Sequence, residues 1–518
     1  MHELIYNYLV NITEMIPFQN TVIWLAILAA VYVLQAVYRS VRGAGRPRRR
    51  GDLPAAVSLG SRWTLYFMAV VFVSVVLRAS TVNIISITSD EGFFIYSAKR
   101  VYEGLQPYRG FILTQQPLYM YVTTAVFRLL GVGVVQAKLI PVAASVLTVL
   151  LAYRFAERVW GRDHALASAA VIGFSPYVVK YTNAATAYPE VILLDLAASV
   201  LFLQGLRGGG YMRLFLSGVC AGLAALYKML GAVVIAPMLL FLIFRHRRGM
   251  LIQSSVILGG ALIALIPATA LLWSPEYVYQ VYLHHGLYED SGVGCKVAEF
   301  FKVLAVDPVF MVPGLVGAFL AYRKVKRKPE EEYFLMYLAC TLPLLFILKY
   351  LCGFAHPYLY FTMSIPPLAV LSGAAFTKAR EGALPVLVSL LLSAAVGYYI
   401  YFVSESYNNA LINSVAEYVG ENSKPGEQVM GMSYLACPVA LKAGRDIPPE
   451  FMEFFHLRVE VENYTVGYYM NATGDVKYAV MYDTRQYPEF NRFLSQHAAL
   501  EKTYGRLKPL RLYRIIHE

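Results

Sequence analysis

The chain has 518 residues, of which 58% are hydrophobic and only 15% are charged, and its mean hydropathy is +0.51. Soluble domains need more charge than this to cover their surface, so the composition indicates a polytopic membrane protein. The formal net charge of +12 comes from basic clusters that lie between hydrophobic stretches without interleaved aromatic platforms, which argues against nucleic-acid binding.

Apolar stretches of roughly 17 to 25 residues, long enough to span a bilayer, occur about twelve times in the chain. We therefore expect an α-helical polytopic membrane protein, with an extra transmembrane helix and a basic loop in residues 1–61 and the main transmembrane module in residues 62–403. The stretches begin near residues 20, 62, 137, 164, 190, 212, 230, 250, 303, 333, 358 and 384.

Basic residues follow every second apolar stretch. Cytoplasmic loops of membrane proteins carry an excess of Lys and Arg, so these alternate loops are predicted to be cytoplasmic. The other loops, including the one around residue 90, and everything after about residue 404 would then lie on the outer face of the cell membrane. The clusters lie at 39–50, 154–162, 207–213, 245–248 and 323–328.

Two adjacent carboxylates, Asp90 and Glu91, lie just beyond the apolar stretch 63–82. A carboxylate kept beside a bilayer is costly unless it is paired, so an acidic pair there is a functional candidate. Either Ser89 or Asp90 can also cap a helix that runs to about Gly104, in which case the acids would only favour the helix dipole. The apolar spacing of that helix predicts an amphipathic helix lying along the membrane surface.

A third acid, Glu190, stands at the start of the span that begins near residue 190, directly after Pro189. A glutamate in the first turn of a helix can serve only to favour the dipole. The functional interpretation gains weight because Glu190 and Asp90 emerge on the same side of the membrane. Asp195, one turn deeper, would be buried in the span and is expected to pair with a neighbouring helix.

Basic groups on the outer side are few. Lys228 lies in a tight connection between two spans, where it would either anchor the chain at the interface or bind an anionic headgroup. The adjacent pair His284 and His285 is either a surface feature or a site for a divalent metal, the only cofactor that the sequence leaves open. The other candidates near the outer ends of spans are Arg109, His356 and Tyr358.

The chain changes character after about residue 404, where apolar runs shorten and charges become more frequent. Residues 410–420 have helical spacing, while 428–432, 477–482 and 510–515 are typical of strands. Residues 404–518 are therefore predicted to form a small α/β domain outside the membrane.

The order of these motifs resembles the GT-C superfamily of integral-membrane glycosyltransferases, which includes protein O-mannosyltransferases and aminoarabinose transferases. The resemblance covers residues 62–518. It rests on the acidic pair after a span, a stretch that ends in Gly104 and Pro107, an acid before a later span, a lysine-containing turn and an aromatic and proline run. In this chain the acidic pair is Asp90-Glu91, the acid is Glu190, the turn contains Lys228 and the aromatic and proline run is 358–367; a further motif, Pro117-Leu118-Tyr119, follows the stretch that ends in Gly104 and Pro107.

The resemblance implies transfer of a monosaccharide from a polyprenyl-phosphate donor to an acceptor hydroxyl on the outer face, with inversion at the sugar. By position, Asp90 matches the general base, Glu91 its companion acid and Glu190 a second acidic site residue. The donor phosphate would be bound by Lys228, Arg109 and His356, with Tyr358 beside it. The acceptor would be a protein, a lipid or a glycan.

One departure from the resemblance concerns the donor site. Aminoarabinose transferases carry Glu-Lys-Pro-Pro where this chain has Thr114-Gln115-Gln116-Pro117, so the lysine that contacts phosphate in that family is absent. Two other classes stay open: a transporter or flippase for a lipid or glycolipid, and a membrane scaffold with an outer sensing domain. The sequence of a transporter is expected to contain an inverted repeat and a charge pair near the bilayer midplane, and neither is evident in this sequence.

Overall fold

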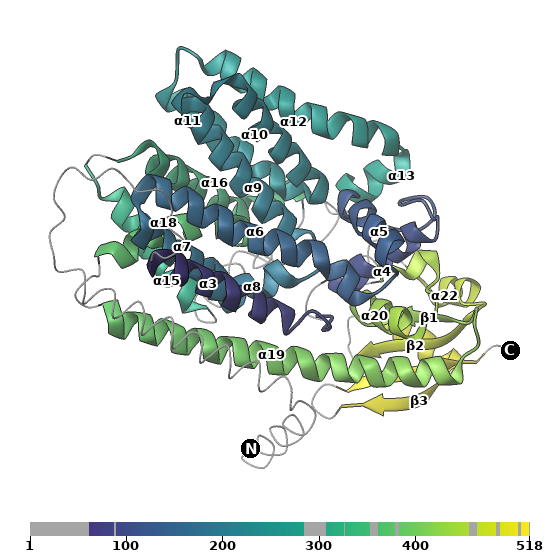
Figure 1. Ribbon diagram of the computed structural model, residues 1–518. Helices are drawn as coiled ribbons and strands as arrows, with labels where there is room; N and C mark the ends of the chain where they lie inside the picture. The colour runs from purple at the N-terminus through teal and green to yellow at the C-terminus, as the bar shows by residue number, and fades with distance from the viewer. Residues whose placement is uncertain are drawn as a thin grey trace.

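The computed structural model describes residues 62–86, 90–283, 307–325, 327–352, 361–378, 383–454, 464–482, 487–505 and 509–516. The span predicted near residue 20 lies outside these described residues. A long helical bundle makes up most of the molecule, and a small sheet lies at one of its ends, next to the C-terminus (Figure 1). This arrangement confirms the predicted fold class.

The helices of the bundle follow one another with short connections. In the first half they are α3 (Arg62–Ala79), α4 (Glu91–Tyr102), α5 (Leu118–Leu130), α6 (Val134–Trp160), α7 (Arg162–Phe174), α8 (Pro176–Asn183), α9 (Tyr188–Gln204), η1 (Gly205–Gly209), α10 (Gly210–Tyr227) and η2 (Met229–Val234). In the second half they are α11 (Ile235–Arg245), α12 (Met250–Leu272), α13 (Pro275–Val278), η3 (Tyr279–Leu283), α15 (Pro308–Tyr322), α16 (Pro329–Cys352), η5 (Phe361–Ser364), α18 (Ile365–Lys378) and α19 (Ala383–Asn422).

Each predicted span from the second onward corresponds to a helix that begins within a few residues of the expected position. Among the described residues, four helices are both long and apolar enough to cross a bilayer: α6, α9 with η1, α10 and α12. Five further apolar helices are shorter, and one of them, α5, was not expected as a span. The number of about twelve spans stays a prediction.

The basic ends of several helices meet at the end of the bundle away from the sheet. The first turn of α16 carries three consecutive glutamates, a favourable place for negative charge because the helix dipole is positive there. These acids pair with cations from three different connections. The ion pairs are Arg207 with Glu330, Lys324 with Glu331, and Arg245 with Glu332, the last at 2.7 Å. The structure thus places these loops, predicted to share one side of the membrane, close together.

The C-terminal region forms a four-stranded sheet with the order β1-β2-β4-β3, in which β1 and β2 are parallel and the other neighbours are antiparallel. The three segments predicted as strands are β1, β2 and β4, and β3 was missed. Only one residue of β2 is not buried, as expected of a central strand. The elements are β1 (Gln428–Gly431), α20 (Ser433–Ala443), η6 (Pro449–Phe451), α22 (Val466–Ala472), β2 (Val476–Tyr482), α23 (Pro488–His497), β3 (Ala498–Tyr504) and β4 (Leu510–Ile515).

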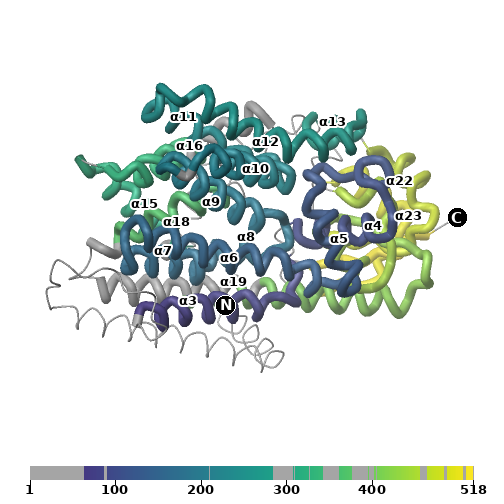
Figure 2. The backbone as a smooth tube through the Cα atoms, turned by 45° about the horizontal axis from the view of Figure 1, so that its top comes forward, coloured from purple at the N-terminus to yellow at the C-terminus, as the bar shows by residue number. Residues whose placement is uncertain are grey.

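Helix α19 joins the bundle to this C-terminal domain as one continuous element of 40 residues (Figure 1). The boundary predicted at residue 404 falls inside it, and the division of the chain into domains stays a prediction. The sheet and its helices lie against α4 and α5 in both overall views (Figures 1 and 2). Asp90 and the loop after α4 therefore lie between the membrane-type helices and the C-terminal domain.

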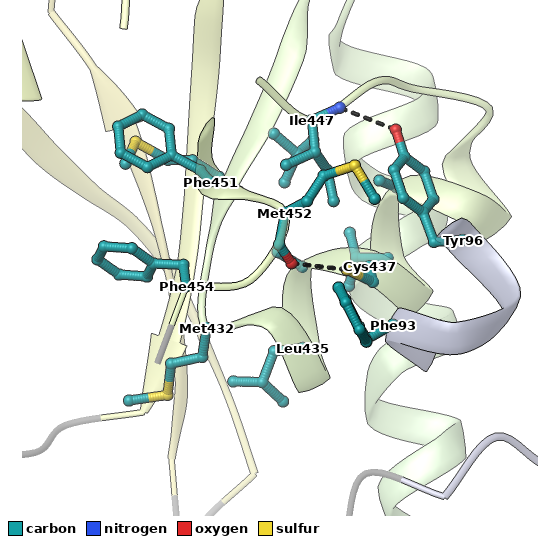
Figure 3. Packing of buried hydrophobic residues seen from close by; sticks show 14 of the residues in the cluster. Phe93, Tyr96, Met432, Leu435, Cys437, Ile447, Phe451, Met452 and Phe454 are labelled. Atoms are coloured by element: carbon teal, nitrogen blue, oxygen red, sulfur yellow. Dashed lines mark hydrogen bonds between the residues drawn. The ribbon is translucent and has the colours of Figure 1, made fainter. Parts of the chain in front are cut away.

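Helix α4 differs from the surface helix that its amphipathic pattern predicted, because it is buried on nearly all sides. One face packs on α5, and the other packs on the C-terminal domain. There Phe93 and Tyr96 contact α20 and the chain that follows it, and the backbone N–H of Ile447 donates a hydrogen bond of 2.9 Å to the Tyr96 hydroxyl (Figure 3). The C-terminal domain covers the face that would otherwise meet water.

The contact between α4 and α20 leaves no room for a side chain at Gly92. A Cβ atom there would lie 2.6 Å from Cδ of Pro438, a ring atom that cannot rotate away. We therefore expect Gly92→Ala to reduce the free energy of unfolding by about 1–3 kcal/mol, measured as a lower melting temperature of the purified protein.

The matched control is Gly259→Ala in α12, where an added methyl group would meet nothing within 4 Å. We expect this variant to melt at the wild-type temperature or slightly above it, because alanine favours the helix. Equal melting temperatures for the two variants would contradict the tight packing of α4 on α20.

Candidate active site

Asp90 lies at the N-terminus of α4 with an exposed side chain. Its backbone carbonyl accepts the first helical hydrogen bond, from the N–H of Phe94 at 3.0 Å, but its carboxylate does not cap the helix. The capping role left open for Asp90 is therefore not seen, and Ser89, the other candidate, lies outside the described residues. The carboxylate is free of the helix N-terminus and accessible to another molecule.

Glu91, the neighbouring acid, is fully buried and strongly bonded. One of its oxygens accepts a hydrogen bond of 2.7 Å from the N–H of Ser86, and the other accepts one of 2.7 Å from the N–H of Ala185. The second oxygen also lies 3.0 Å from Nζ of Lys138, which is buried too. Glu91 thus joins the end of the loop after α3 to the loop before α9. This geometry gives it a positioning role, and its part in catalysis stays a prediction.

Lys228 lies between α10 and η2 in extended conformation, with only 9% of its surface exposed. Its Nζ donates a hydrogen bond of 3.1 Å to Oε1 of Gln115, from the loop before α5. The ammonium also lies 4.5 Å from the ring centroid of Tyr188 and 5.3 Å from that of Phe94, within the range of cation–π attraction. Lys228 therefore does not simply anchor the chain at the interface, since it points into the protein among groups from three other segments.

Burial and two carboxylates have opposite effects on the pKa of Lys228. Burial is the larger effect and lowers the pKa of Lys228 to about 8, while the negative charges of Asp90 and Glu453 act in the opposite direction. Lys228 is therefore mostly protonated below pH 8 and loses its charge above it. We refer to Asp90, Gln115, Lys228 and Glu453 as the polar cluster.

Glu190 lies in the first turn of α9 and is buried, with 4% of its surface exposed. Neither carboxylate oxygen accepts a hydrogen bond from another residue in the part of the chain that the structure describes. Its charge acts on two phenols, those of Tyr119 on α5 and Tyr227 at the end of α10. A buried carboxylate without a partner is costly, which is typical of a site that a ligand completes.

The remaining candidates are less informative. Arg109 is exposed, and its Nε lies 3.9 Å from the Glu276 carboxylate; among the described residues no contact joins it to Asp90 or Lys228. Asp195 accepts a hydrogen bond of 3.1 Å from the Tyr337 hydroxyl of α16, which confirms the expected pairing with a neighbouring helix. The other predicted residues lie outside the described residues: His284, His285, His356 and Tyr358.

Glu453 was not identified from the sequence. It follows η6 in the C-terminal domain, in a stretch of mainly apolar residues, where nothing in its local pattern indicates a site. Gln115 was noted only as a departure from the aminoarabinose transferase motif. In the described part of the chain no group of three or more His, Cys, Asp or Glu residues is arranged to hold a metal ion, so a metal at His284 and His285 stays a prediction.

The pairing of Glu91 with Lys138 gives a test of its positioning role. Glu91→Gln would leave the Lys138 ammonium buried without its counter-charge, so we expect it to destabilise the protein by about 3–5 kcal/mol, seen as a lower melting temperature. The double variant with Lys138→Met removes both charges and should recover part of that loss. A double variant no more stable than Glu91→Gln would contradict the buried ion pair.

Comparisons with known proteins support the same fold. Residues 114–273 match the family model of dolichyl-phosphate-mannose-protein mannosyltransferases, a region that contains Gln115, Glu190 and Lys228. No curated protein matches the chain in sequence. The crystal structure of apo ArnT from Cupriavidus metallidurans superposes with a TM-score of 0.64 and 15% identity, covering 88% of this chain and 98% of ArnT.

Two further structures extend the comparison. ArnT from the same organism, bound to undecaprenyl phosphate, superposes with a TM-score of 0.59 and 14% identity over 88% of this chain and 98% of ArnT. The oligosaccharyltransferase of Archaeoglobus fulgidus gives a TM-score of 0.52 and 14% identity over 80% of this chain and 69% of its own. At such identities a similar structure establishes a shared fold, and function has to be argued from the site. The chain has the fold of the GT-C membrane glycosyltransferases, the superfamily that the order of its motifs resembles.

Proposed function

We propose that this protein transfers a monosaccharide from a polyprenyl-phosphate donor to a hydroxyl group of a protein, lipid or glycan acceptor, with inversion at the sugar. The observation that carries the proposal is the exposed carboxylate of Asp90, whose negative charge acts on the buried ammonium of Lys228. A base and a cation are what such a transfer needs at its two ends. The match to the mannosyltransferase family and the undecaprenyl phosphate bound by ArnT support a lipid-linked donor.

Lys228 would bind the phosphate of the donor. An ammonium group has three N–H donors, and among the described residues only Gln115 accepts a hydrogen bond from it. The remaining donors are directed by a buried side chain with little freedom to move, so they can bond phosphate oxygens without a large loss of entropy. As the sugar leaves, the phosphate gains negative charge, and a fixed cation stabilises that charge more than it stabilises the intact donor.

Asp90 would act as the general base. In the transfer, the acceptor oxygen attacks the anomeric carbon while its proton passes to the Asp90 carboxylate. The bond from the anomeric carbon to the phosphate oxygen breaks, and its electron pair stays on the phosphate. A single displacement of this kind inverts the configuration at the sugar. The exposure of Asp90 lets an acceptor reach it, while the α4 backbone that carries it is held on both faces.

Glu190 would bind the sugar. Its two oxygens have no hydrogen-bond partner among the described residues, so sugar hydroxyls can supply the donors that the protein does not. Glu91 would position both acids, because it joins the start of α4, which follows Asp90, to the loop that leads into α9 and Glu190. Nothing in the described geometry gives Arg109 a comparable role.

The polar cluster would face the outer side of the membrane. The basic loops lie together at the opposite end of the bundle from the C-terminal domain, and such loops are retained in the cytoplasm. The polar cluster and the C-terminal domain would then be extracytoplasmic, in an integral multi-pass protein of the cell membrane.

Replacing the base tests the proposal. We expect Asp90→Asn to lower the rate of sugar transfer about 10²–10⁴-fold while undecaprenyl phosphate still binds, because the amide keeps the shape of the side chain but cannot accept the proton. The measurement is transfer of radiolabelled sugar from polyprenyl-phosphate monosaccharides to membrane extracts by purified wild type and variant. Asp163→Asn, at the start of α7, serves as the matched control and should transfer at the wild-type rate.

Two outcomes would contradict the proposal. Equal transfer by wild type and Asp90→Asn would remove Asp90 as the base. A folded wild-type protein that binds undecaprenyl phosphate but transfers sugar from none of the donors would instead favour a lipid or glycolipid transporter.

The pH dependence of the reaction tests the role of Lys228. Because the pKa of Lys228 is about 8, its side chain carries a positive charge below pH 8 and loses that charge as the pH rises through this value. We therefore expect kcat/KM for the donor, which reports ionisations of the free enzyme, to fall about tenfold per pH unit above pH 8. Lys228→Arg keeps its charge at all these pH values and should abolish the decline. A wild-type profile that is flat up to pH 10 would contradict this role.

A further inference from the structure

The chain from Asp446 to Glu453 of the C-terminal domain lies along α4 and the loop that follows it. At its start, the Asp446 carboxylate is 3.2 Å from Nζ of Lys99 and 2.9 Å from Nη1 of Arg100 on α4. Further on, the Pro449 carbonyl accepts a hydrogen bond of 3.5 Å from the N–H of Ile112. These contacts hold the C-terminal domain against the segment that carries Asp90 and Gln115.

Glu453, at the end of this segment, places a carboxylate next to the loop that carries Gln115. Glu453 is buried, and its carboxylate accepts both hydrogen-bond donors of Thr114: the backbone N–H at 2.9 Å and the hydroxyl. Thr114 immediately precedes Gln115, whose side chain contacts Lys228. Glu453 thus fixes the backbone next to the group that orients the cation, and its charge also acts on that cation directly.

We propose that Glu453 is a positioning residue for the donor site, supplied by the C-terminal domain, which holds Thr114 and Gln115 in place and keeps the Lys228 ammonium charged and correctly directed. This inference rests on the proposed function where it assigns the donor phosphate to Lys228. It makes the C-terminal domain a part of the site.

The need for a second carboxylate follows from the chemistry of Asp90. Two negative charges act on Lys228, those of Asp90 and Glu453. When Asp90 takes up the proton of the acceptor, its charge disappears while the phosphate is leaving. Glu453 then remains as the one of these two carboxylates that still supports the charge of the buried ammonium. Within the described part of the chain, the other groups recorded against the Lys228 ammonium are uncharged: the rings of Tyr188 and Phe94 and the amide of Gln115.

The test compares undecaprenyl phosphate binding by full-length wild type, Glu453→Gln and Thr114→Val between pH 6 and pH 10. Glu453→Gln keeps the shape of the side chain and loses its charge. We expect it to lower the pH at which binding is half lost by about one unit, the effect of one nearby opposite charge, and to weaken binding several-fold at pH 8. Thr114→Val, which loses one of the two hydrogen bonds, should weaken binding without the same shift in pH.

The matched control is Glu427→Gln, in the same domain, whose carboxylate pairs with Lys477 at 3.1 Å and not with the polar cluster. It should bind as wild type does at every pH. If Glu453→Gln only lowers the melting temperature and leaves the pH profile unchanged, Glu453 has a purely structural role and the proposal is wrong.

A second measurement separates this inference from the proposed function. The extent to which a small amine-reactive reagent modifies Lys228 is measured by mass spectrometry over the same pH range. Because only the neutral amine reacts, the midpoint of this curve reports the ionisation of Lys228 without any ligand. A lower midpoint in Glu453→Gln than in wild type and Glu427→Gln would support the role of Glu453. If undecaprenyl phosphate then bound to none of the three proteins, only the assignment of the donor phosphate to Lys228 would be contradicted. Identical midpoints would overturn the inference.

Discussion

The geometry of the site depends on the burial of one carboxylate, that of Glu91. A fully buried anion is tolerated only when hydrogen bonds and an opposite charge surround it, and here two backbone N–H groups and Lys138 do so. Because those N–H groups come from the loops after α3 and before α9, satisfying Glu91 brings together three segments that are far apart in the sequence. The proposed base Asp90, before α4, and Glu190, at the start of α9, take their relative positions from this contact. Of two adjacent acids, the structure exposes one and buries the other, which is how a single dipeptide can serve both chemistry and architecture.

The proposed donor site illustrates how a charge can be supplied from a different element. Where aminoarabinose transferases carry a lysine, this chain has Gln115, so the lysine that contacts phosphate in that family is absent here. The structure places the ammonium of Lys228, from the end of α10, 3.1 Å from the Gln115 side chain. A lysine at position 115 would bring two ammonium groups together and raise the energy of both, whereas the glutamine amide offers an acceptor. A neutral residue at 115 and a cation at 228 are thus mutually consistent, and the missing lysine does not exclude an anionic donor.

Much of this organisation could be predicted from the sequence, because bilayer-spanning helices have a strong and local signal in their length and apolarity. The helices near the expected positions from residue 62 onward follow from it, while the strands around residues 428, 477 and 510 follow from short runs typical of strands. Asp90, Glu190 and Lys228 could be selected because charged groups at helix ends beside a membrane are unusual. The burial of α4 could not be predicted, since its amphipathic pattern fits a membrane surface and a domain interface equally well. Glu453 could not be selected either, because its importance depends on a contact with Thr114 across more than 300 positions of sequence.

That contact also bears on what the C-terminal domain does. A domain tethered only by α19 could move freely with respect to the bundle, since a single helix constrains distance more than orientation. Here Asp446, Ile447, Pro449 and Glu453 contact α4 and the loop before α5 in succession, so the domain is attached along the same segment that carries Asp90 and Gln115. Any acceptor that reaches Asp90 must approach beside this attachment. In the proposed reaction the C-terminal domain therefore borders the acceptor at Asp90, and through Glu453 and Thr114 it also reaches the donor side that Lys228 and Glu190 would form, so that one domain bears on both substrates.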